Sequence, residues 1–160
     1  MPSASLHSEP VQATGAEPRR WAFLLHGIYG AGRNWNAVLR RLVERRPDWG
    51  VIAVDLRGHG QSPALQPPHD LSACVADLDR LARTLPDPPE VVIGHSFGGK
   101  VALLYADEPS HGVRQAWVVD STPEARPPAG SAWHMLDVLR RCPGPFAIRE
   151  AGVEAVLSQG

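Results

Sequence analysis

The sequence predicts an α/β fold in which a parallel sheet is covered by helices on both faces. Short apolar runs alternate along the chain with segments that have helical periodicity. Polar residues do not interrupt the apolar runs, which is typical of strands that are buried on both faces. Each run ends in a polar residue or a glycine, so the candidate functional side chains are expected at the carboxyl edge of the sheet.

The first strand is expected at 21–25, after a polar segment at 1–19 that we interpret as a flexible leader with at most one weak strand. A glycine-rich loop at 27–32 follows this strand. Apolar residues at helical spacing then predict a helix that begins near residue 34 and ends at Pro47. These apolar residues are Trp35, Val38, Leu39, Leu42 and Val43.

Three further apolar runs predict strands at 51–54, 91–93 and 116–119. Amphipathic residues between the first two runs predict a helix over 71–85, and the apolar segment 100–106 predicts another helix. The regular alternation of strand and helix supports a parallel sheet.

The pattern changes after Pro123. A link rich in proline and glycine covers 124–130, and helices are expected at 131–141 and 147–158. The domain division that we expect is a leader at 1–19, an α/β core at 20–123 and a helical segment at 124–160.

Composition limits the classes of function. With 43% hydrophobic and 21% charged residues, the 160-residue chain is expected to form one globular domain. Its net charge of -1 gives no reason to expect a nucleic-acid partner, and no stretch is long enough to span a membrane. Cys74 and Cys142 form neither a metal motif nor a disulfide framework. We therefore expect no metal, no cofactor and a cytoplasmic location, since no signal peptide is recognisable.

The most informative segment is 94–99, with the sequence Gly-His-Ser-Phe-Gly-Gly. A strand, a sharp turn at a serine and a helix are the context that a nucleophile elbow requires. The glycines on either side of the serine leave room for a strained turn. Ser96 would then stand above the sheet, with the Phe97 amide directed at a developing oxyanion. The alternative is an ordinary glycine-rich turn between a strand and a helix.

Three motifs together resemble the α/β-hydrolase superfamily. They are the His-Gly loop at 26–30, the Asp-Leu-Arg-Gly-His-Gly-Gln-Ser turn at 55–62 and the elbow at 94–99. The resemblance extends over 21–123. It implies that the four predicted strands are the third to the sixth of that fold, in the spatial order four-three-five-six. It also implies that 124–160 begins a helical cap and that the fold is incomplete.

The same resemblance suggests roles for individual residues. Ser96 would be the nucleophile, and the amides of Ile28 and Phe97 would form the oxyanion hole. The residues expected around the substrate are His26, Gly27, His95 and Trp133. The alternative for His26 is a structural hydrogen bond beneath the loop, and the alternative for Trp133 is ordinary helix packing.

Asp120 directly follows the predicted strand at 116–119, 24 residues after Ser96. This position is similar to that of the acid in small carboxylesterases that carry it after the sixth strand. There it would orient a histidine and stabilise its charge. The alternative is a strand-end aspartate that accepts hydrogen bonds from nearby amides.

The general base is not apparent in the sequence. A serine hydroxyl is a weak nucleophile without one, and the superfamily's histidine follows an eighth strand that would lie beyond residue 160. None of the seven histidines has a matching context. His95 neighbours Ser96 but is expected to point away from it, and His134 lies in the predicted cap.

Two classes of function therefore remain open. The first is a serine hydrolase of small carboxylic esters or thioesters, which forms an acyl-enzyme on Ser96 and is impaired by the absent histidine. The second is a non-catalytic fragment or pseudoenzyme that serves as a binding module. Haloperoxidases, carbon–carbon bond hydrolases and certain lyases share the same motifs. The strand at 116–119 would be an unprotected sheet edge, where a completing chain or a second copy is expected to bind.

Overall fold

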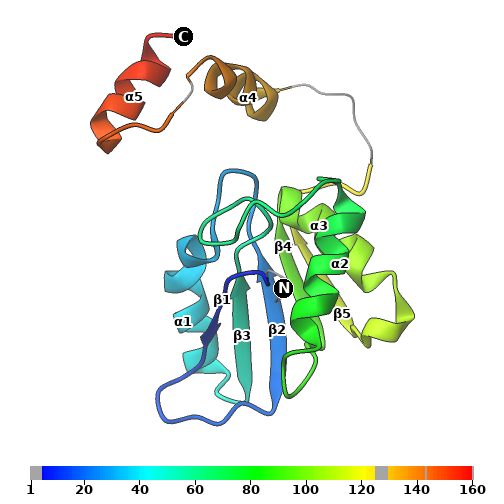
Figure 1. The fold of residues 1–160 in the computed structure, drawn as a ribbon. Coiled ribbons are helices and arrows are strands. Elements are labelled where there is room, and N and C mark those ends of the chain that lie inside the picture. Colours follow the sequence, from blue (N-terminus) through cyan, green and yellow to red (C-terminus); the bar gives the residue numbers. More distant parts are fainter. Residues whose placement is uncertain (1–4, 125–129, 143, 160) are drawn as a thin grey trace. The chain divides into compact units, whose positions relative to one another are not determined.

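The computed structural model describes residues 5–124, 130–142 and 144–159. These residues divide into two compact units on either side of the bond between Pro123 and Glu124, and each unit is described by itself. The first unit contains a sheet with helices on both of its faces, and the second contains two helices (Figure 1).

One five-stranded sheet organises the first unit. Its strands are β1 (Ser8–Val11), β2 (Arg20–Leu25), β3 (Trp49–Val54), β4 (Val91–His95) and β5 (Gln115–Val119). Their order across the sheet is β1-β3-β2-β4-β5. The last four are parallel, which confirms the predicted α/β fold and strand order. The sheet is mixed rather than parallel throughout, because β1 runs antiparallel to β3.

β1 comes from the segment that was expected to be a flexible leader. Its register places Ser8 beside Val54 and Val11 beside Val51. Just outside the strand, the Asp55 amide donates to the His7 carbonyl at 2.9 Å. These ladder bonds fix residues 7–11 at the edge of the sheet.

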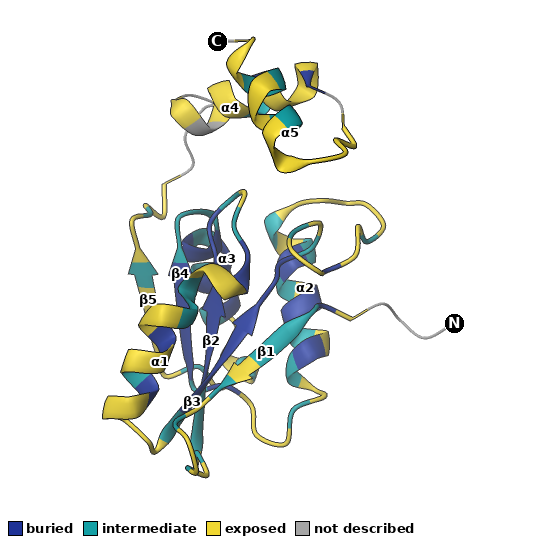
Figure 2. Cartoon of the chain, turned by 90° about the vertical axis from the view of Figure 1, so that its left-hand side faces the viewer, coloured by how far each residue is buried: buried dark blue, intermediate teal, exposed yellow. Residues whose placement is uncertain are grey.

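Helices cover the two faces unequally. α1 (Asn36–Arg45) packs on one face, and α2 (Leu71–Ala82) and α3 (Phe97–Ala106) pack on the other. Side chains alternate along β2, so Phe23 faces α2 and α3 while Leu24 faces α1. Both are buried, and Figure 2 shows the buried residues concentrated in the central strands. Two short 3-10 turns, η1 (Gly32–Trp35) and η2 (Pro109–His111), complete this unit.

β5 is far more exposed than the other parallel strands. Trp117 and Val119 are 52% and 40% exposed, whereas Val92 on the neighbouring strand is fully buried. On the α1 face, an open groove of about 370 Å³ runs from β3 to β5. Its apolar lining includes Ala22, Leu42, Trp49, Val51, Ile93 and Trp117. In the described part of this unit, α1 is the only helix that packs on this face.

The second unit consists of α4 (Ser131–Arg141) and α5 (Arg149–Leu157). Its small interior includes Val138 and Cys142, and the Cys142 thiol donates to the Ala155 carbonyl at 3.3 Å. Several large apolar side chains of this unit are exposed. They are Trp133, Met135, Leu139, Phe146, Ile148, Val153 and Leu157.

Candidate active site

Ser96 lies at the turn between β4 and α3, with φ at 51° and ψ at −114°. An L residue rarely adopts a left-handed φ, and such a conformation costs about 1–3 kcal/mol when the surroundings impose it. The Ser96 side chain makes no capping hydrogen bond to α3. The structure therefore contains the strand–turn–helix geometry that the motif predicts, and the Ser96 hydroxyl is not used as a helix cap.

Backbone atoms approach so closely to Gly94 and Gly98 that neither position has room for a side chain. A Cβ on Gly98 would lie 2.4 Å from the Leu25 carbonyl oxygen, and one on Gly94 would lie 2.2 Å from the Gly98 carbonyl oxygen. Both obstacles are backbone atoms, which cannot swing aside as a flexible side chain can. The two glycines thus let α3 begin directly against the end of β2.

The Phe97 amide opens α3 and belongs to its first turn. Amides in the first turn of a helix have no intrahelical acceptor, and the helix dipole adds partial positive charge there. The turn is held tight because the Gly99 amide donates to the Ser96 carbonyl at 2.9 Å. An oxyanion formed at Ser96 would find a donor of this kind directly beside it.

The His-Gly loop reaches the elbow through Gly27. A Cβ on Gly27 would lie 2.7 Å from His95 Nδ1 and 3.2 Å from the Ser96 Cβ, so the loop backbone lies against the candidate nucleophile. The loop turns back at once, since the Gly30 amide donates to the Gly27 carbonyl at 3.0 Å. Ile28, whose amide is the second predicted oxyanion donor, directly follows Gly27 in this turn.

His26 is buried beneath the loop, with an exposed fraction of 1%. Its Nε2 accepts from the Leu56 amide at 3.0 Å, so Nδ1 carries the proton and donates to the Gly27 carbonyl at 2.7 Å. Burial lowers the pKa of His26 below 6.5, although the Gly27 carbonyl opposes the shift. Both ring nitrogens of His26 are thus bonded within the protein, and His26 joins the loop to the 55–62 turn. This geometry agrees with the structural alternative for His26, and a contact with substrate stays a prediction.

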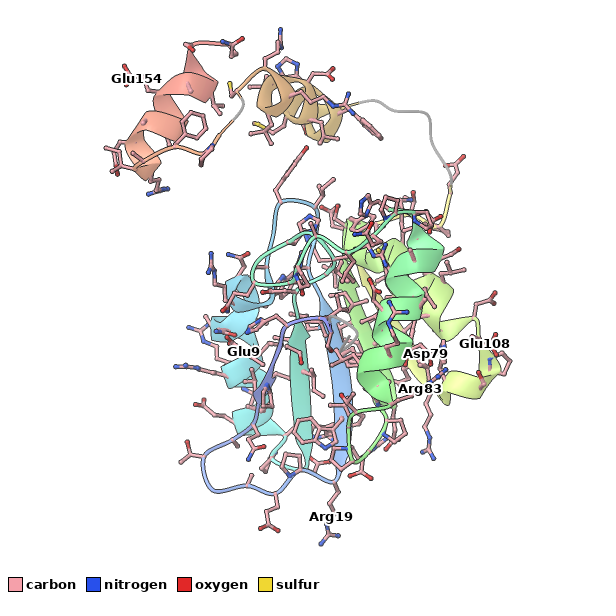
Figure 3. The ribbon with its side chains drawn as sticks, in the orientation of Figure 1. Glu9, Arg19, Asp79, Arg83, Glu108 and Glu154 are labelled. Carbon is pink, nitrogen blue, oxygen red and sulfur yellow. The ribbon has the colours of Figure 1, made fainter. Side chains whose placement is uncertain are left out.

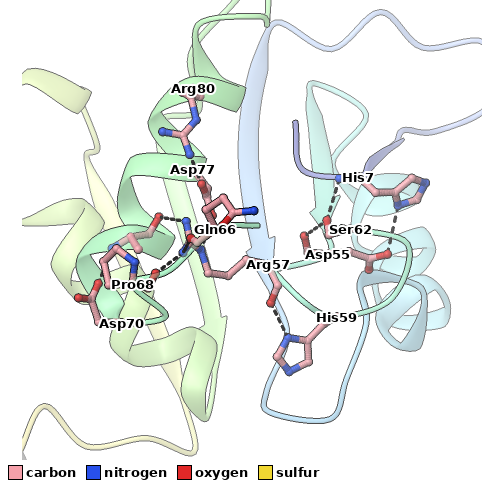
Figure 4. Close-up of polar contacts among 11 residues, drawn as sticks. His7, Asp55, Arg57, His59, Ser62, Gln66, Pro68, Asp70, Asp77 and Arg80 are labelled. Atoms are coloured by element: carbon pink, nitrogen blue, oxygen red, sulfur yellow. Dashed lines mark hydrogen bonds and ion pairs between the residues drawn. The ribbon is translucent and has the colours of Figure 1, made fainter. Parts of the chain in front are cut away.

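Asp55 joins three segments of the chain, and Figure 4 shows its contact with His7. Its Oδ1 accepts from the Gly32 amide at 2.7 Å, and its Oδ2 accepts from the Gln61 amide at 2.9 Å and lies 3.1 Å from His7 Nδ1. Burial would raise the pKa of Asp55, but the two amides and His7 lower it overall. No motif or periodicity marks His7 in the sequence, so its part in this cluster was not predicted.

Arg57 binds the 55–62 turn to α2 (Figure 4). Its Nε donates to Asp77 Oδ2 at 2.6 Å, and its two terminal nitrogens donate to the carbonyls of Pro68 and Ala73 at 2.5 Å and 3.2 Å. Asp77 also binds Arg80. These contacts hold the 55–62 turn against the first turns of α2.

Asp120 follows β5 with a left-handed φ of 49°, so the chain turns sharply there. Its Oδ2 lies 4.0 Å from His95 Nε2, and its side chain is 89% exposed. The His95 ring packs on Trp35, with the ring centroids 5.5 Å apart. The structure thus brings Asp120 beside the elbow, at the edge where the sequence predicted it, but leaves its carboxylate in solvent.

Within the described residues, no histidine is hydrogen-bonded to Ser96 Oγ. His111 lies at the opposite end of β5, and both of its ring nitrogens have partners there. Nδ1 lies 2.8 Å from the Tyr105 carbonyl oxygen, and Nε2 lies 3.5 Å from Asp79 Oδ1. Figure 3 labels Asp79 on α2, together with its ion-pair partner Arg83. Trp133 and His134 belong to the second unit, so the expected place of Trp133 near the substrate stays a prediction.

Among the described residues, no group of three or more His, Cys, Asp or Glu side chains is arranged to hold a metal ion. No helix in this part of the chain has the length and hydrophobicity needed to cross a membrane.

Comparisons with known proteins agree with this geometry. Residues 23–137 match the family described as alpha/beta hydrolase fold. The sn-1-specific diacylglycerol lipase ABHD11 of Mus musculus is 38% identical over 104 residues, which are 65% of this chain and 33% of the relative. Lipase LipV of Mycobacterium tuberculosis is 39% identical over 96 residues, which are 60% of this chain and 35% of the relative.

Solved structures show the same fold. A marine microorganism esterase superposes with a TM-score of 0.81 at 23% sequence identity, over 98% of this chain and 59% of the esterase. The chain thus spans about a third of the length of the two lipases and about three fifths of the esterase.

Proposed function

Because the chain belongs to the α/β-hydrolase family, we propose that it carries the nucleophile and oxyanion hole of a serine hydrolase of small carboxylic esters or thioesters. One observation carries this proposal. Ser96 has a left-handed φ of 51° while Gly27 packs against its Cβ, so a strained serine stands beside two backbone turns. Two similar proteins are named as lipases, which agrees with an acyl ester as substrate.

In the proposed reaction, Ser96 Oγ attacks the carbonyl carbon of the ester and gives its proton to a general base. The oxyanion of the tetrahedral intermediate accepts hydrogen bonds from the amides of Ile28 and Phe97. The intermediate collapses to an acyl-enzyme, and the base returns the proton to the leaving alcohol or thiol. Water then attacks the acyl carbon in the same way and releases the acid.

The base in this scheme is a histidine that is not among the described neighbours of Ser96. Asp120 is the acid proposed to orient it, and the solvated carboxylate leaves space for an imidazole to approach. A segment that follows residue 160 in a longer protein, or a completing chain, would supply this histidine. We expect the 160-residue chain by itself to retain only the slow catalysis that an oxyanion hole and substrate binding provide.

Fluorophosphonate labelling tests the nucleophile, with turnover of p-nitrophenyl butyrate measured alongside. We expect slow labelling of the purified chain that Ser96→Ala abolishes, together with weak turnover that the same variant abolishes. Ser110→Ala is a matched control on η2, remote from the elbow in the fold. A folded chain that is labelled equally with and without Ser96 contradicts the proposed nucleophile.

The alternative function is a binding module without catalysis, and the absence of an adjacent base in the described residues favours it. A folded chain that is neither labelled nor active would support this alternative. We also propose a cytoplasmic location, which agrees with Cys74 and Cys142 as free, buried thiols.

A further inference from the structure

We propose that Tyr29 is a specificity-determining residue of the candidate active site, and that its ring contacts an apolar acyl group of the substrate. This inference rests on the proposed hydrolase function and adds to it the chemical class of the acyl group. It starts from the backbone of the loop at 27–30.

Tyr29 has a left-handed φ of 64°. Such a conformation is a clear outlier for a bulky L residue, because its Cβ crowds the backbone. Within the described residues, only two other non-glycine residues have a positive φ, and these are Ser96 and Asp120. They are the proposed nucleophile and the proposed acid. Strained residues gather at functional sites, so the third member of the set suggests a role for Tyr29 in the same site.

The loop uses its glycines for close contacts and not for this left-handed position. A Cβ on Gly27 would lie 3.2 Å from the Ser96 Cβ, and one on Gly30 would lie 2.9 Å from the Gly27 carbonyl oxygen. Neither glycine has a left-handed φ. A glycine at position 29 would adopt this φ without strain. A tyrosine at such a position is expected where the side chain itself is needed.

Packing within the fold does not explain the tyrosine. Neither hydrophobic core of the first unit includes Tyr29, which is 45% exposed. The other tyrosine of the chain, Tyr105, is 1% exposed and packs edge-on against the Phe23 ring, with the centroids 5.9 Å apart. Because a ring that is half in solvent contributes little to core stability, the strain at Tyr29 has no compensation in the core.

The turn keeps Tyr29 close to Ser96. The Gly30 amide donates to the Gly27 carbonyl at 3.0 Å, so Tyr29 is the third residue of a tight four-residue turn. Two residues of chain span at most about 7 Å, which limits the distance between the Cα atoms of Gly27 and Tyr29. Since Gly27 itself packs against Ser96, a side chain of this length can reach a group that is bonded to Ser96.

The chemistry of the ring indicates what it would contact. A phenol ring offers a flat apolar surface that ends in one polar group. An acyl chain that lies along this surface leaves water, and each buried methylene strengthens binding by about fourfold. The acyl class that this contact favours is therefore a medium-length apolar chain in preference to acetyl.

Binding of the product acid tests the contact without catalysis. Acetate and octanoate are titrated into the Ser96→Ala chain, and binding is followed by nuclear magnetic resonance. We expect octanoate to bind at least about tenfold more tightly than acetate. Adding Tyr29→Gly should abolish this preference, whereas Tyr29→Phe should retain it because the ring remains. Leu104→Ala, which removes an exposed apolar side chain from α3, is the matched control.

Fluorophosphonates with short and long alkyl chains test the same contact in the reacting site. With Ser96 intact, we expect the octyl probe to label the chain about tenfold faster than the ethyl probe. Tyr29→Gly should remove this difference, and Tyr29→Phe should preserve it.

Thermal unfolding distinguishes a functional tyrosine from a structural one. We expect Tyr29→Gly to raise the thermal midpoint by about 2 °C, because glycine relieves the backbone strain. A lower midpoint would make Tyr29 a packing residue of the fold and would overturn the proposal.

The binding results also separate this proposal from the proposed function. Equal affinity for the two acids in the Ser96→Ala chain, or a preference that survives Tyr29→Gly, would overturn the role of Tyr29 whether or not Ser96 is labelled. A preference that Tyr29→Gly abolishes in a chain whose Ser96 is not labelled would support the acyl contact and contradict the nucleophile. Loss of the preference in Tyr29→Phe would assign the effect to the hydroxyl and contradict an apolar contact.

Discussion

At the scale of single residues, Gly98 is one of the two elbow positions where backbone atoms leave no room for a side chain. Its Cα separates α3 from the carbonyls of Leu25 and His26, which would lie 2.4 Å and 2.5 Å from an added Cβ. Relief of this clash requires α3 to move away from β2, and the Ser96 turn would move with it.

We therefore expect Gly98→Ala to lower the free energy of unfolding by about 3 kcal/mol, the upper end of typical overpacking costs. Urea unfolding measures this change. Gly144→Ala is the control, since its added Cβ meets only ordinary contacts at 3.6 Å and beyond. Equal stability of the two variants would mean that α3 adjusts freely.

His26 gives the first unit a dependence on pH. Burial keeps the pKa of His26 in the folded chain below its ordinary value of 6.5. The unfolded chain therefore binds more protons than the folded chain just below this pH. The contribution of His26 to stability is complete above pH 6.5 and is lost as the pH falls toward the lower folded pKa.

We expect the free energy of unfolding to decrease as the pH falls from about 7.5 to 5.5, and His26→Gln to make this decrease smaller. Glutamine retains an acceptor for the Leu56 amide but does not titrate. His69→Gln, in an exposed loop, should keep the wild-type dependence. Parallel urea titrations at the two pH values measure the slopes, and an unchanged slope in His26→Gln would refute this account.

At the scale of elements, one buried ion pair connects the 55–62 turn to α2. The Arg57 and Asp77 side chains are 9% and 1% exposed, while the similar pair of Arg46 and Asp48 is 57% and 48% exposed. Removal of one partner from a buried pair leaves the other charge without compensation.

Asp77→Asn should therefore lower the free energy of unfolding by about 3 kcal/mol. Asp48→Asn should have no measurable effect, because solvent screens the exposed pair. Thermal and urea unfolding of the two variants provide the comparison. If both variants behave alike, the position of the turn does not depend on Asp77.

The strands also show which elements a sequence can reveal. The apolar runs of β2, β3 and β4 identify strands because both faces of each strand are buried. An apolar run does not identify β1, because its sequence Ser-Glu-Pro-Val is short and half-polar. Its partner residues on β3 lie at least 40 residues away in the chain. Only the ladder with β3 makes it a strand. The contact between His7 and Asp55 could not be predicted for the same reason, because it joins distant segments of the chain.

At the scale of the whole molecule, the sequence predicts the α/β core well because its motifs are local. The strand order follows from the resemblance to the α/β hydrolases, and the nearness of Ser96, Gly27 and Asp120 follows from parallel strands that end at one edge. The sequence left two roles open for His26, and only the fold shows its hydrogen bonds beneath the loop. The exposure of Asp120 could not be predicted, since it depends on which other segments cover the carboxylate. Trp133 and Ser96 belong to different units, and no sequence motif determines how far apart they lie.

Both hydrophobic cores of the first unit are built from residues between Leu6 and Val113. We therefore expect a chain that ends after Pro123 to fold without residues 124–160. Its thermal midpoint should lie within about 4 °C of that of the full chain, the shift produced by roughly 1 kcal/mol. Near-ultraviolet circular dichroism and a melting curve test this, and a truncated chain without fixed tertiary structure would show that the two units depend on each other.

The edge of the sheet at β1 carries its own protection against strand addition. β1 is only four residues long and contains Glu9 and Pro10, a combination that discourages pairing with another strand. The His7 carbonyl accepts from Asp55 on the β3 side, so the backbone of Pro10, three residues later, faces the open side. Proline has no N–H group to donate, and an approaching strand would lack a ladder bond there. A substitution that removed Pro10 would therefore make aggregation through this edge more favourable.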